Sequence, residues 1–147
     1  MKRFIFIFIA LCAVVVIVWV LTRDTLAPIF TKREIESYAH SLIRVTAPPP
    51  HASVSSPLTI VGEARGTWFF EATFPVVIVD WDGRIIGESY ATAQGEWMTE
   101  DFVPFSATLT FDAPTLYKRG AIILQKSNPS GLPEHDDALE LPITFAP

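Results

Sequence analysis

The sequence predicts an all-β sandwich of about seven short strands, preceded by one N-terminal transmembrane helix. Three observations lead to this prediction. From residue 43 to the C-terminus, short apolar or alternating segments recur at intervals of about 8–12 residues. Glycine, proline, asparagine and aspartate separate these segments, and no convincing helical pattern follows residue 42. The one long uninterrupted apolar run lies at the N-terminus.

The chain of 147 residues is long enough for one domain with an appended segment. We expect an uncleaved transmembrane anchor over residues 1–27, a juxtamembrane linker or short helix over 28–42, and a globular domain over 43–147. Half of the residues are apolar, which suffices for a substantial core. The single cysteine, Cys12, excludes an intramolecular disulfide, so packing alone must hold that core together.

The predicted anchor is the apolar run Phe4–Leu21, which follows Lys2 and Arg3. As a helix, its 18 residues span roughly 27 Å, close to the hydrocarbon thickness of a bilayer. The run is longer than the apolar region of a signal peptide, and no small-residue cleavage site follows it. We therefore expect a retained single-pass anchor, with the rest of the chain on the outer side of the membrane.

A short juxtamembrane helix is expected within the linker. Thr31–Glu34 has the pattern of a capping box, in which the first and fourth side chains each bond to the other's backbone N–H. Ile35, Tyr38, Ala39 and Leu42 follow at helical spacing. The alternative is a stalk with little regular structure.

The first strand is expected over Ser41–Thr46, with Ile43 and Val45 on one face. Pro48–Pro50 lacks backbone N–H donors, so it predicts an extended crossing at an edge, between two strand segments. The second strand is expected over Leu58–Arg65.

Gly62–Gly83 is the segment around which we expect the other strands to pack. Its density of aromatic and β-branched residues favours one long central strand. Asp82-Gly83 predicts a type I′ hairpin into the next strand, Arg84–Ala93, because both central residues of that turn need positive φ. The residues that carry this interpretation are Trp68, Phe69, Phe70, Phe74, Val76–Val79 and Trp81.

Two later segments alternate with a period of two, as half-buried strands do. The predicted inward residues are Val103, Phe105, Ala107, Leu109 and Phe111 in one segment, and Leu139, Leu141, Ile143 and Phe145 in the other. Between them we expect a loop at Asp112–Gly120, a short strand at Ala121–Gln125 and a long loop at Ser127–Asp137. Pro142 places the last strand at an edge of its sheet.

Charge limits the classes of partner. From residue 45 onward the chain has thirteen acidic and five basic residues, a net charge of −8. An acidic domain is poorly suited to bind nucleic acid or to lie on anionic lipid. We expect no nucleic-acid partner and no cofactor, and we interpret the charge as keeping an exported domain soluble.

Three segments together resemble the Gmad2 family, the immunoglobulin-like domain of bacterial spore germination proteins. They are IRVTAPPPHASVSSPLTIVGEARGTWFFEATFPV, QGEWMTEDFVPFSATLTF and QKSNPSGLPEHD. The similarity extends from about Ile43 to Phe145. It implies an immunoglobulin-like sandwich on an exported bacterial protein without catalytic residues. Some family members also carry a germination or peptidase-like module, whereas we expect the domain here to stand alone behind its predicted anchor.

Catalytic and metal sites are not favoured by the sequence. Ser130, His135 and Asp136 share one loop, but Ser130 lies in Asn128–Gly131, a segment typical of a turn rather than of a nucleophile elbow. His40, His51 and His135 are too scattered for zinc. The candidate carboxylates for a cation site are Glu134, Asp136 and Asp137, with Asp80 or Asp82. Their spacing matches no calcium motif, and solvated loop charges are the simpler interpretation.

Two candidate binding regions remain. One is the acidic tip of the long loop, formed by Glu134, Asp136 and Asp137. The other is a groove lined by Trp68, Glu71 and Trp97. Glu71 interrupts an aromatic run, so it either pairs with Arg65 or points outward, and aromatic residues in sandwiches more often fill the core.

The sequence therefore predicts a non-enzymatic, membrane-anchored, extracytoplasmic immunoglobulin-like module on a bacterial cell membrane. It binds a protein or a cell-envelope component, or serves as a structural spacer. The alternative is an accessory domain that binds carbohydrate or peptidoglycan through an aromatic platform. An exposed coplanar tryptophan pair would favour the alternative, whereas an exposed sheet edge or apolar patch would favour protein binding.

Overall fold

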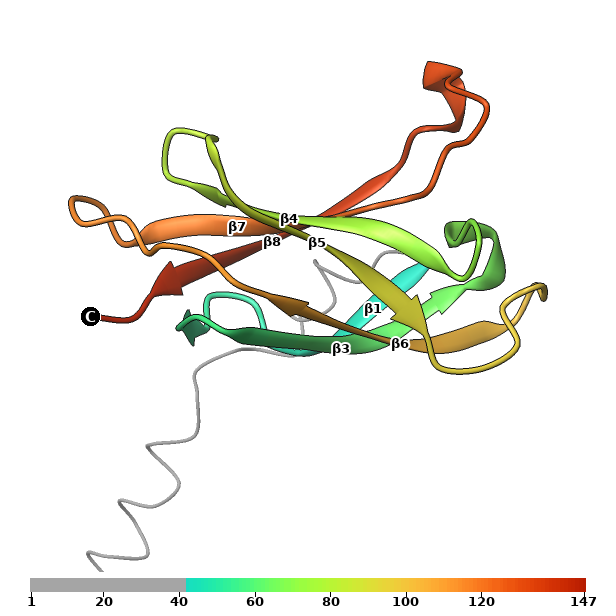
Figure 1. Ribbon diagram of the computed structural model, residues 1–147, viewed down its shortest axis with the longest axis horizontal. Coiled ribbons are helices and arrows are strands. Elements are labelled where there is room, and N and C mark those ends of the chain that lie inside the picture. The colour runs from blue at the N-terminus through green and yellow to red at the C-terminus, as the bar shows by residue number, and fades with distance from the viewer. Residues whose placement is uncertain (1–41) are drawn as a thin grey trace, which may run out of the picture. The chain divides into compact units, whose positions relative to one another are not determined.

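Eight β-strands make up most of the computed structural model, which describes residues 42–147 (Figure 1). The strands are β1 Ile43–Ala47, β2 Ser53–Val54, β3 Leu58–Arg65, β4 Thr73–Asp80, β5 Ile85–Ala93, β6 Phe102–Leu109, β7 Arg119–Gln125 and β8 Ala138–Phe145. Two single turns of 3-10 helix accompany them in this part of the chain, η2 Gly66–Trp68 and η3 Pro133–His135. The predicted anchor and juxtamembrane helix lie outside the described residues. Within residues 42–147, no helix is long and apolar enough to cross a membrane.

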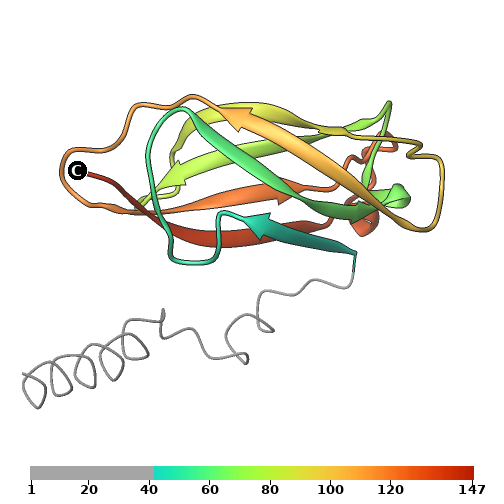
Figure 2. The ribbon, with the colours of Figure 1, turned by 90° about the horizontal axis from the view of Figure 1, so that it is seen from below.

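The strands form one hydrogen-bonded sheet in the order β1-β3-β6-β5-β4-β7-β8-β2, which curls into two layers (Figures 1 and 2). β1, β3 and β6 make one layer, and β4, β7 and β8 make the other. β5 joins them, because it pairs with β4 along its length and with β6 only through Thr92 and Ala93. The all-β prediction is confirmed, and the additional strand is the two-residue β2.

The three prolines lie where the chain passes from one layer to the other. β1 pairs with β3, whereas β2 pairs in parallel with β8, and Pro48–Pro50 connects β1 to β2. His51 N–H donates to the Pro142 carbonyl at 2.6 Å and ties the crossing to β8. The predicted crossing is present, but it is not extended throughout, because Ala52 N–H donates to the Pro49 carbonyl at 3.2 Å across a turn in which His51 has a φ of 61°.

The prediction that Pro142 places the last strand at an edge is wrong, because β2 lies outside β8 and pairs with it at Thr144 and Phe145. β2 has only two residues, so most of this side of β8, including Pro142, has no strand partner among the described residues.

The core fills the space between the layers. Every residue predicted to face inward from the two alternating segments is buried, whereas Thr108, on the opposite face of β6, is exposed. Phe74 lies among the aromatic rings, edge-on to Phe105 at 5.0 Å, Phe69 at 5.2 Å and Trp68 at 6.4 Å between centroids. Such edge-to-face pairs add about 0.5–1.5 kcal/mol each beyond the burial of their area.

The prediction of one long strand over Gly62–Gly83 is wrong. β3 and β4 lie in different layers, so the chain must cross between them, and η2 and a tight turn make this crossing. Phe70 and Thr73 exchange backbone hydrogen bonds of 2.9 and 3.0 Å, and Glu71 and Ala72 between them both have positive φ. Trp68 and Phe69 are thereby turned into the end of the core instead of lining a strand.

The predicted hairpin after β4 is present, but it is not of type I′. Gly83 has a φ of 77° and its N–H donates to the Asp80 carbonyl at 3.0 Å, while Asp82 does not have positive φ. The reason is the side chain of Asp80. Its Oδ1 accepts hydrogen bonds from the N–H groups of Asp82 and Arg84, both at 3.0 Å, which hold the loop in this geometry.

Candidate functional site

The loop that contains Ser130 and His135 lacks the geometry of a catalytic triad. Ser130 Oγ lies 2.9 Å from His135 Nδ1, but its proton is donated to Asn128 Oδ1. The carboxylate of Asp136 accepts from Asn128 Nδ2 at 2.7 Å and does not orient His135. These side chains are exposed or half-buried on the loop surface. These hydrogen bonds join residues of the same loop to one another and do not activate Ser130 as a nucleophile.

The turn predicted at Asn128–Gly131 is confirmed. Gly131 N–H donates to the Asn128 carbonyl at 3.3 Å, and Gly131 has a φ of 66°. Asn128 Nδ2 also donates to the Leu132 carbonyl at 2.8 Å. The side chain of Asn128 is therefore hydrogen-bonded to Ser130, Leu132 and Asp136. The turn leads into η3 and the acidic tip.

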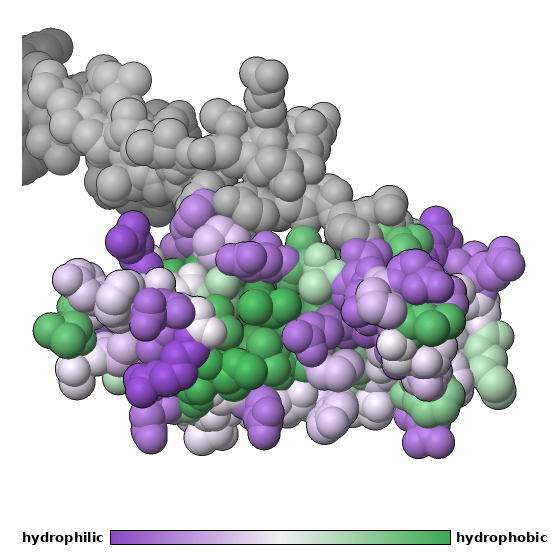
Figure 3. Space-filling model, turned by 90° about the horizontal axis from the view of Figure 1, so that it is seen from above, coloured by the Kyte–Doolittle hydropathy of each residue, from purple (hydrophilic) through white to green (hydrophobic). Residues whose placement is uncertain are grey.

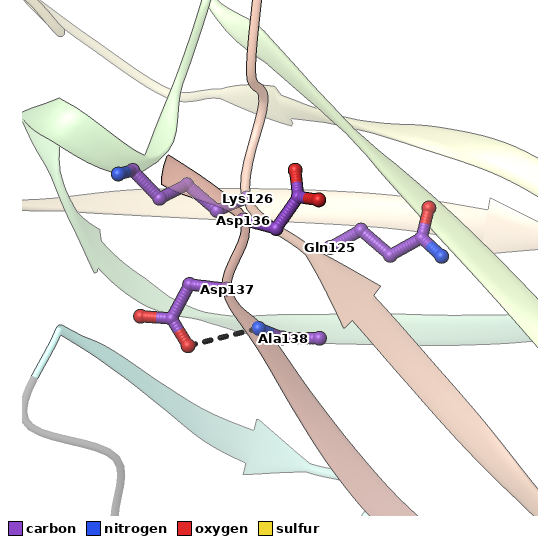
Figure 4. Close-up of a pocket in the computed structure, with 5 residues that line it drawn as sticks. All are labelled: Gln125, Lys126, Asp136, Asp137 and Ala138. Atoms are coloured by element: carbon purple, nitrogen blue, oxygen red, sulfur yellow. Dashed lines mark hydrogen bonds between the residues drawn. The ribbon is translucent and has the colours of Figure 1, made fainter. Parts of the chain in front are cut away.

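The acidic tip borders an open, polar hollow of about 570 Å³ at the base of the loop (Figure 4). Asp136 and Asp137 line it together with Lys126, and Asp137 Oδ1 also accepts the N–H of Ala138 at 2.9 Å. Glu134 and Asp136 are exposed.

The other predicted carboxylates, Asp80 and Asp82, lie in the hairpin at the opposite end of the sandwich (Figure 1). Over residues 42–147 no group of three histidine, cysteine or acidic side chains is arranged to hold a metal ion.

The predicted groove of Trp68, Glu71 and Trp97 is not assembled. Trp68 is fully buried, so its indole cannot stack against a ligand. Glu71 points outward from its turn, because Arg65 instead donates to the Glu100 carbonyl and lies over the ring of Phe102 at 4.1 Å.

Trp97 is half-buried beside a shallow hollow of about 380 Å³ that Phe69 and Met98 also line. Thus only one aromatic residue of the predicted platform borders an accessible hollow.

The sequence analysis missed an apolar outer face on the layer that contains β4. Val77, Val79, Ala121 and Ile123 form a cluster separate from the main core, which we call the outer patch. Register explains it, because Val77 lies opposite Ile123 and Val79 opposite Ala121 on β7. Figure 3 shows apolar surface at the middle of this face, bordered by polar side chains. The sequence signal was the lack of polar alternation in Val76–Val79.

A hollow of about 490 Å³ adjoins the outer patch. Its floor includes Pro75 and Val77, and two exposed side chains of β5 flank it, Ile85 at 55% and Tyr90 at 64% exposure. Ser89 and Gln125 are the polar neutral residues of its lining. Glu88 is the one charged residue among the described residues that line it.

An exposed aromatic pair lies at the hairpin end. The rings of Trp81 and Tyr117 are 4.6 Å apart between centroids and are inclined at 61°. Both side chains are about half exposed. The inclination makes an edge-to-face contact, so the pair does not present the flat surface on which a sugar ring stacks.

The model of the Gmad2 family, the immunoglobulin-like domain of bacterial spore germination, matches residues 42–131. The chain belongs to the Gmad2 family. No curated protein and no solved structure gives a significant match. The Gmad2 domain is not a known enzyme family.

The Gmad2 match ends at Gly131, before β8 begins, yet β8 is part of the same fold. Its inward residues enter the main core, and it pairs with β7 from Ala138 to Thr144. The strand that closes the sheet therefore lies beyond the matched region.

Asp80 is the one buried charged residue of the described part of the Gmad2 domain. Burial acts to raise its pKa, but the N–H groups of Arg84 and Asp82 and the guanidinium of Arg84 outweigh burial. The pKa of Asp80 consequently lies below its ordinary value. Arg84 Nε is 3.3 Å from Asp80 Oδ2. The carboxylate of Asp80 therefore holds the hairpin through this ion pair and through its hydrogen bonds to the backbone N–H groups of the turn.

Proposed function

We propose that this chain is a non-enzymatic, membrane-anchored module on the outer side of a bacterial cell, and that its Gmad2 domain binds a protein. The observation that carries the proposal is the outer patch with the hollow beside it. An antiparallel sheet that faces water on one side normally presents polar residues there. Here aliphatic side chains from β4 and β7 occupy the middle of that face. Val77, Val79 and Ala121 are only 5–8% exposed, so the accessible apolar area comes from half-buried Ile123 and from exposed Ile85 and Tyr90.

The chemistry of this surface favours a protein over a carbohydrate polymer. Carbohydrate recognition by stacking needs a flat, accessible aromatic ring. Trp68 is buried, and the exposed rings of Trp81 and Tyr117 meet at 61°. Valine, alanine and isoleucine side chains instead match the apolar centre of a protein interface, with Glu88 as part of a polar rim.

The location in the proposal is supported by the sequence of the N-terminal segment. Lys2 and Arg3 precede the apolar run Phe4–Leu21, an arrangement that retains the N-terminus in the cytoplasm. Fractionation of cells should recover the full-length chain in the membrane, with its C-terminal domain open to protease added outside. N-terminal sequencing that begins near residues 22–28 would instead indicate cleavage of the anchor.

Site-specific photo-crosslinking of the full chain in living cells tests protein binding. A photoreactive amino acid in place of Ile85, beside the outer patch, should form a protein adduct. The matched control is the same amino acid in place of Thr108, which is exposed on the other layer. The proposal predicts an adduct at residue 85 and none at 108. Equal adducts at both positions, or no protein adduct at residue 85, would contradict it.

A further inference from the structure

β4 is apolar on both of its faces. Phe74, Val76 and Ile78 lie in the main core, and Val77 and Val79 lie in the outer patch. A strand without polar alternation is typical of a sheet that is covered on both sides. The strands of residues 42–147 make two layers, and none of them makes a third layer over the outer face (Figure 1). The composition of β4 therefore suits a strand that a further element covers.

Four strands contribute one residue each to a row across this face. Glu88 of β5 lies opposite Val77 of β4. Val77 lies opposite Ile123 of β7, and Ile123 lies opposite Glu140 of β8. Directly opposite residues of antiparallel strands point to the same face of the sheet. The two exposed glutamates therefore lie on either side of an apolar pair, three strand spacings or about 14 Å apart.

The neighbouring row is apolar throughout. Val79 lies opposite Ile85 of β5 on one side and opposite Ala121 of β7 on the other. Ala121 in turn lies opposite Pro142 of β8. Because residues two apart on a strand point to the same face, this row lies beside the first one. The two rows together give an apolar stripe along β4 and β7, with a carboxylate on each side of it.

Two hollows open on this face, and each is lined by one of the two glutamates. Glu88 lines the hollow of about 490 Å³ together with Val77. Glu140 lines a second hollow, of about 370 Å³, together with Val79 and Ala121. Both hollows therefore combine a residue of the outer patch with an exposed carboxylate.

The accessible apolar area lies at the walls of these hollows, because the residues of the outer patch at their floors are nearly buried. Ile85 and Tyr90, on the wall of the first hollow, are more than half exposed. Trp81, on the wall of the second, is half exposed. A partner that fills the hollows would cover these three side chains.

We infer that the partner segment is an amphipathic α-helix that lies along β4 on this face, with aliphatic side chains toward the hollows and lysine or arginine beside both Glu88 and Glu140. A helix with its side chains is about 10–12 Å wide, which fits between carboxylates about 14 Å apart. Amphipathic helices have an apolar stripe with polar residues on each side, as this face does. Basic residues on the two flanks complement the two carboxylates. The inference rests on the proposed function, because it names the kind of protein segment that is bound.

The other charged residues that line the second hollow are compatible with such a helix. Asp80 is buried and forms an ion pair with Arg84. Arg119 lies at the end of the stripe, one residue beyond the pair of Asp80 with Gly120. The C-terminal end of a bound helix, which carries partial negative charge, complements Arg119 there.

The helix expected over residues 31–42 of this same chain fits the face less well. That segment contains two basic residues, Lys32 and Arg33, and two acidic ones, Glu34 and Glu36. It therefore brings no net positive charge to a face that has a carboxylate on each side. A separate protein with a basic helix satisfies both the shape and the charge.

Cross-linking of synthetic peptides to the full chain in non-ionic detergent tests the inference. The chain carries the photoreactive amino acid in place of Ile85, so that only peptide bound beside Glu88 reacts. The probe is a biotin-labelled peptide of about 16 residues, or about 24 Å as a helix, with leucines at helical spacing and lysines on both flanks of the leucine stripe. One control peptide has the same composition arranged with a period of two, and the other has glutamate in place of lysine.

Adduct formation with the probe should saturate, and each control should need at least about tenfold more peptide for the same yield. Equal yield with the period-two peptide would overturn the helix, and equal yield with the glutamate peptide would overturn the basic flanks. The absence of a saturable adduct with the probe would overturn the inference as a whole.

Charge reversal tests the role of the two glutamates. Glu88→Lys combined with Glu140→Lys should reverse the preference, so that the glutamate peptide gives the adduct at the lower concentration. The matched control is Glu100→Lys combined with Glu134→Lys, which makes the same change in net charge at exposed positions outside the outer-face rows and hollows. An unchanged preference in the first variant, or an equal reversal in the control, would overturn the assignment of Glu88 and Glu140.

The mass of adducts formed without peptide identifies other occupants of the face. A link from residue 85 to residues 28–41 of the same chain, or to a second copy of the chain, would overturn the assignment of a partner helix. A protein adduct at residue 85 in cells together with equal yields from all three peptides would leave the proposed function in place and overturn the helix alone. The absence of a protein adduct in cells would contradict the proposed function itself.

Discussion

β4 and β6 lie in opposite layers and differ in how many of their faces are apolar. β6 alternates, with Val103, Phe105 and Leu109 buried and Pro104 and Thr108 exposed to water. β4 has Phe74, Val76 and Ile78 in the core, and also Val77 and Val79 in the outer patch. The layer of β6 thus resembles a sheet with one solvated face, whereas the β4 strand is apolar on both faces.

The largest expected effect lies in the core beneath β6. Phe105→Ala removes a buried ring in contact with Phe74 and should lower the free energy of unfolding by about 3–5 kcal/mol. Thr108→Ala, on the exposed face of the same strand, should lower it by less than about 1 kcal/mol. Urea denaturation measures both. Equal losses would mean that the faces of β6 are assigned incorrectly.

A smaller difference is expected between the two faces of β4. Val76→Ala should cost about 2 kcal/mol, because two buried methyl groups are lost and leave a cavity in the core. Val77→Ala should cost less than Val76→Ala, because Val77 packs in the small outer patch and not in the main core. The same urea experiment compares them. A larger loss for Val77→Ala would contradict the separation of the outer patch from the main core.

The long loop offers a test of backbone geometry without a change in packing. Gly131 has a φ of 66°, and a Cβ there would meet nothing within 4 Å. Gly131→Val should therefore destabilise the fold by about 1–2 kcal/mol through left-handed strain alone. Glu134→Ala, at an exposed position of the same loop, is the control and should leave the melting temperature unchanged. An unchanged melting temperature in Gly131→Val would show that the turn is not required.

The smallest expected effect is the acid dependence of the hairpin after β4. The pKa of Asp80 is lower in the folded chain than its ordinary value, which is about 3.9. Its contribution to stability is complete above that value and is lost as the pH falls through the lower folded pKa. Denaturation at a series of acidic pH values should show a slope below about pH 4 that Asp80→Asn reduces. Asp82→Asn, at an exposed position of the same turn, is the control, and an identical slope in Asp80→Asn would contradict this account.

The sequence was informative where local pattern determines structure. The period of two in β6 and β8 predicted their buried faces, and Pro48–Pro50 predicted the crossing. The break before β4 could not be predicted, because β3 and β4 are assigned to different layers by long-range pairing. The hairpin type was missed because it depends on the buried carboxylate of Asp80.

The candidate site was harder to predict than the fold. An aromatic residue such as Trp68 suits a binding platform and a core equally well, and only packing distinguishes the two. Val76–Val79 did contain a signal for the outer patch, because a strand with one solvated face would alternate.

Hydrogen–deuterium exchange tests most directly whether the outer face of the β4 layer is occupied in the cell. Exchange of the full chain is measured in native envelope membranes and after purification in detergent. The account predicts that amides in residues 85–91 of β5 exchange more slowly in the native membranes, while those of β6, Phe102–Leu109, are unchanged. Equal exchange of β5 in the two preparations would contradict the account.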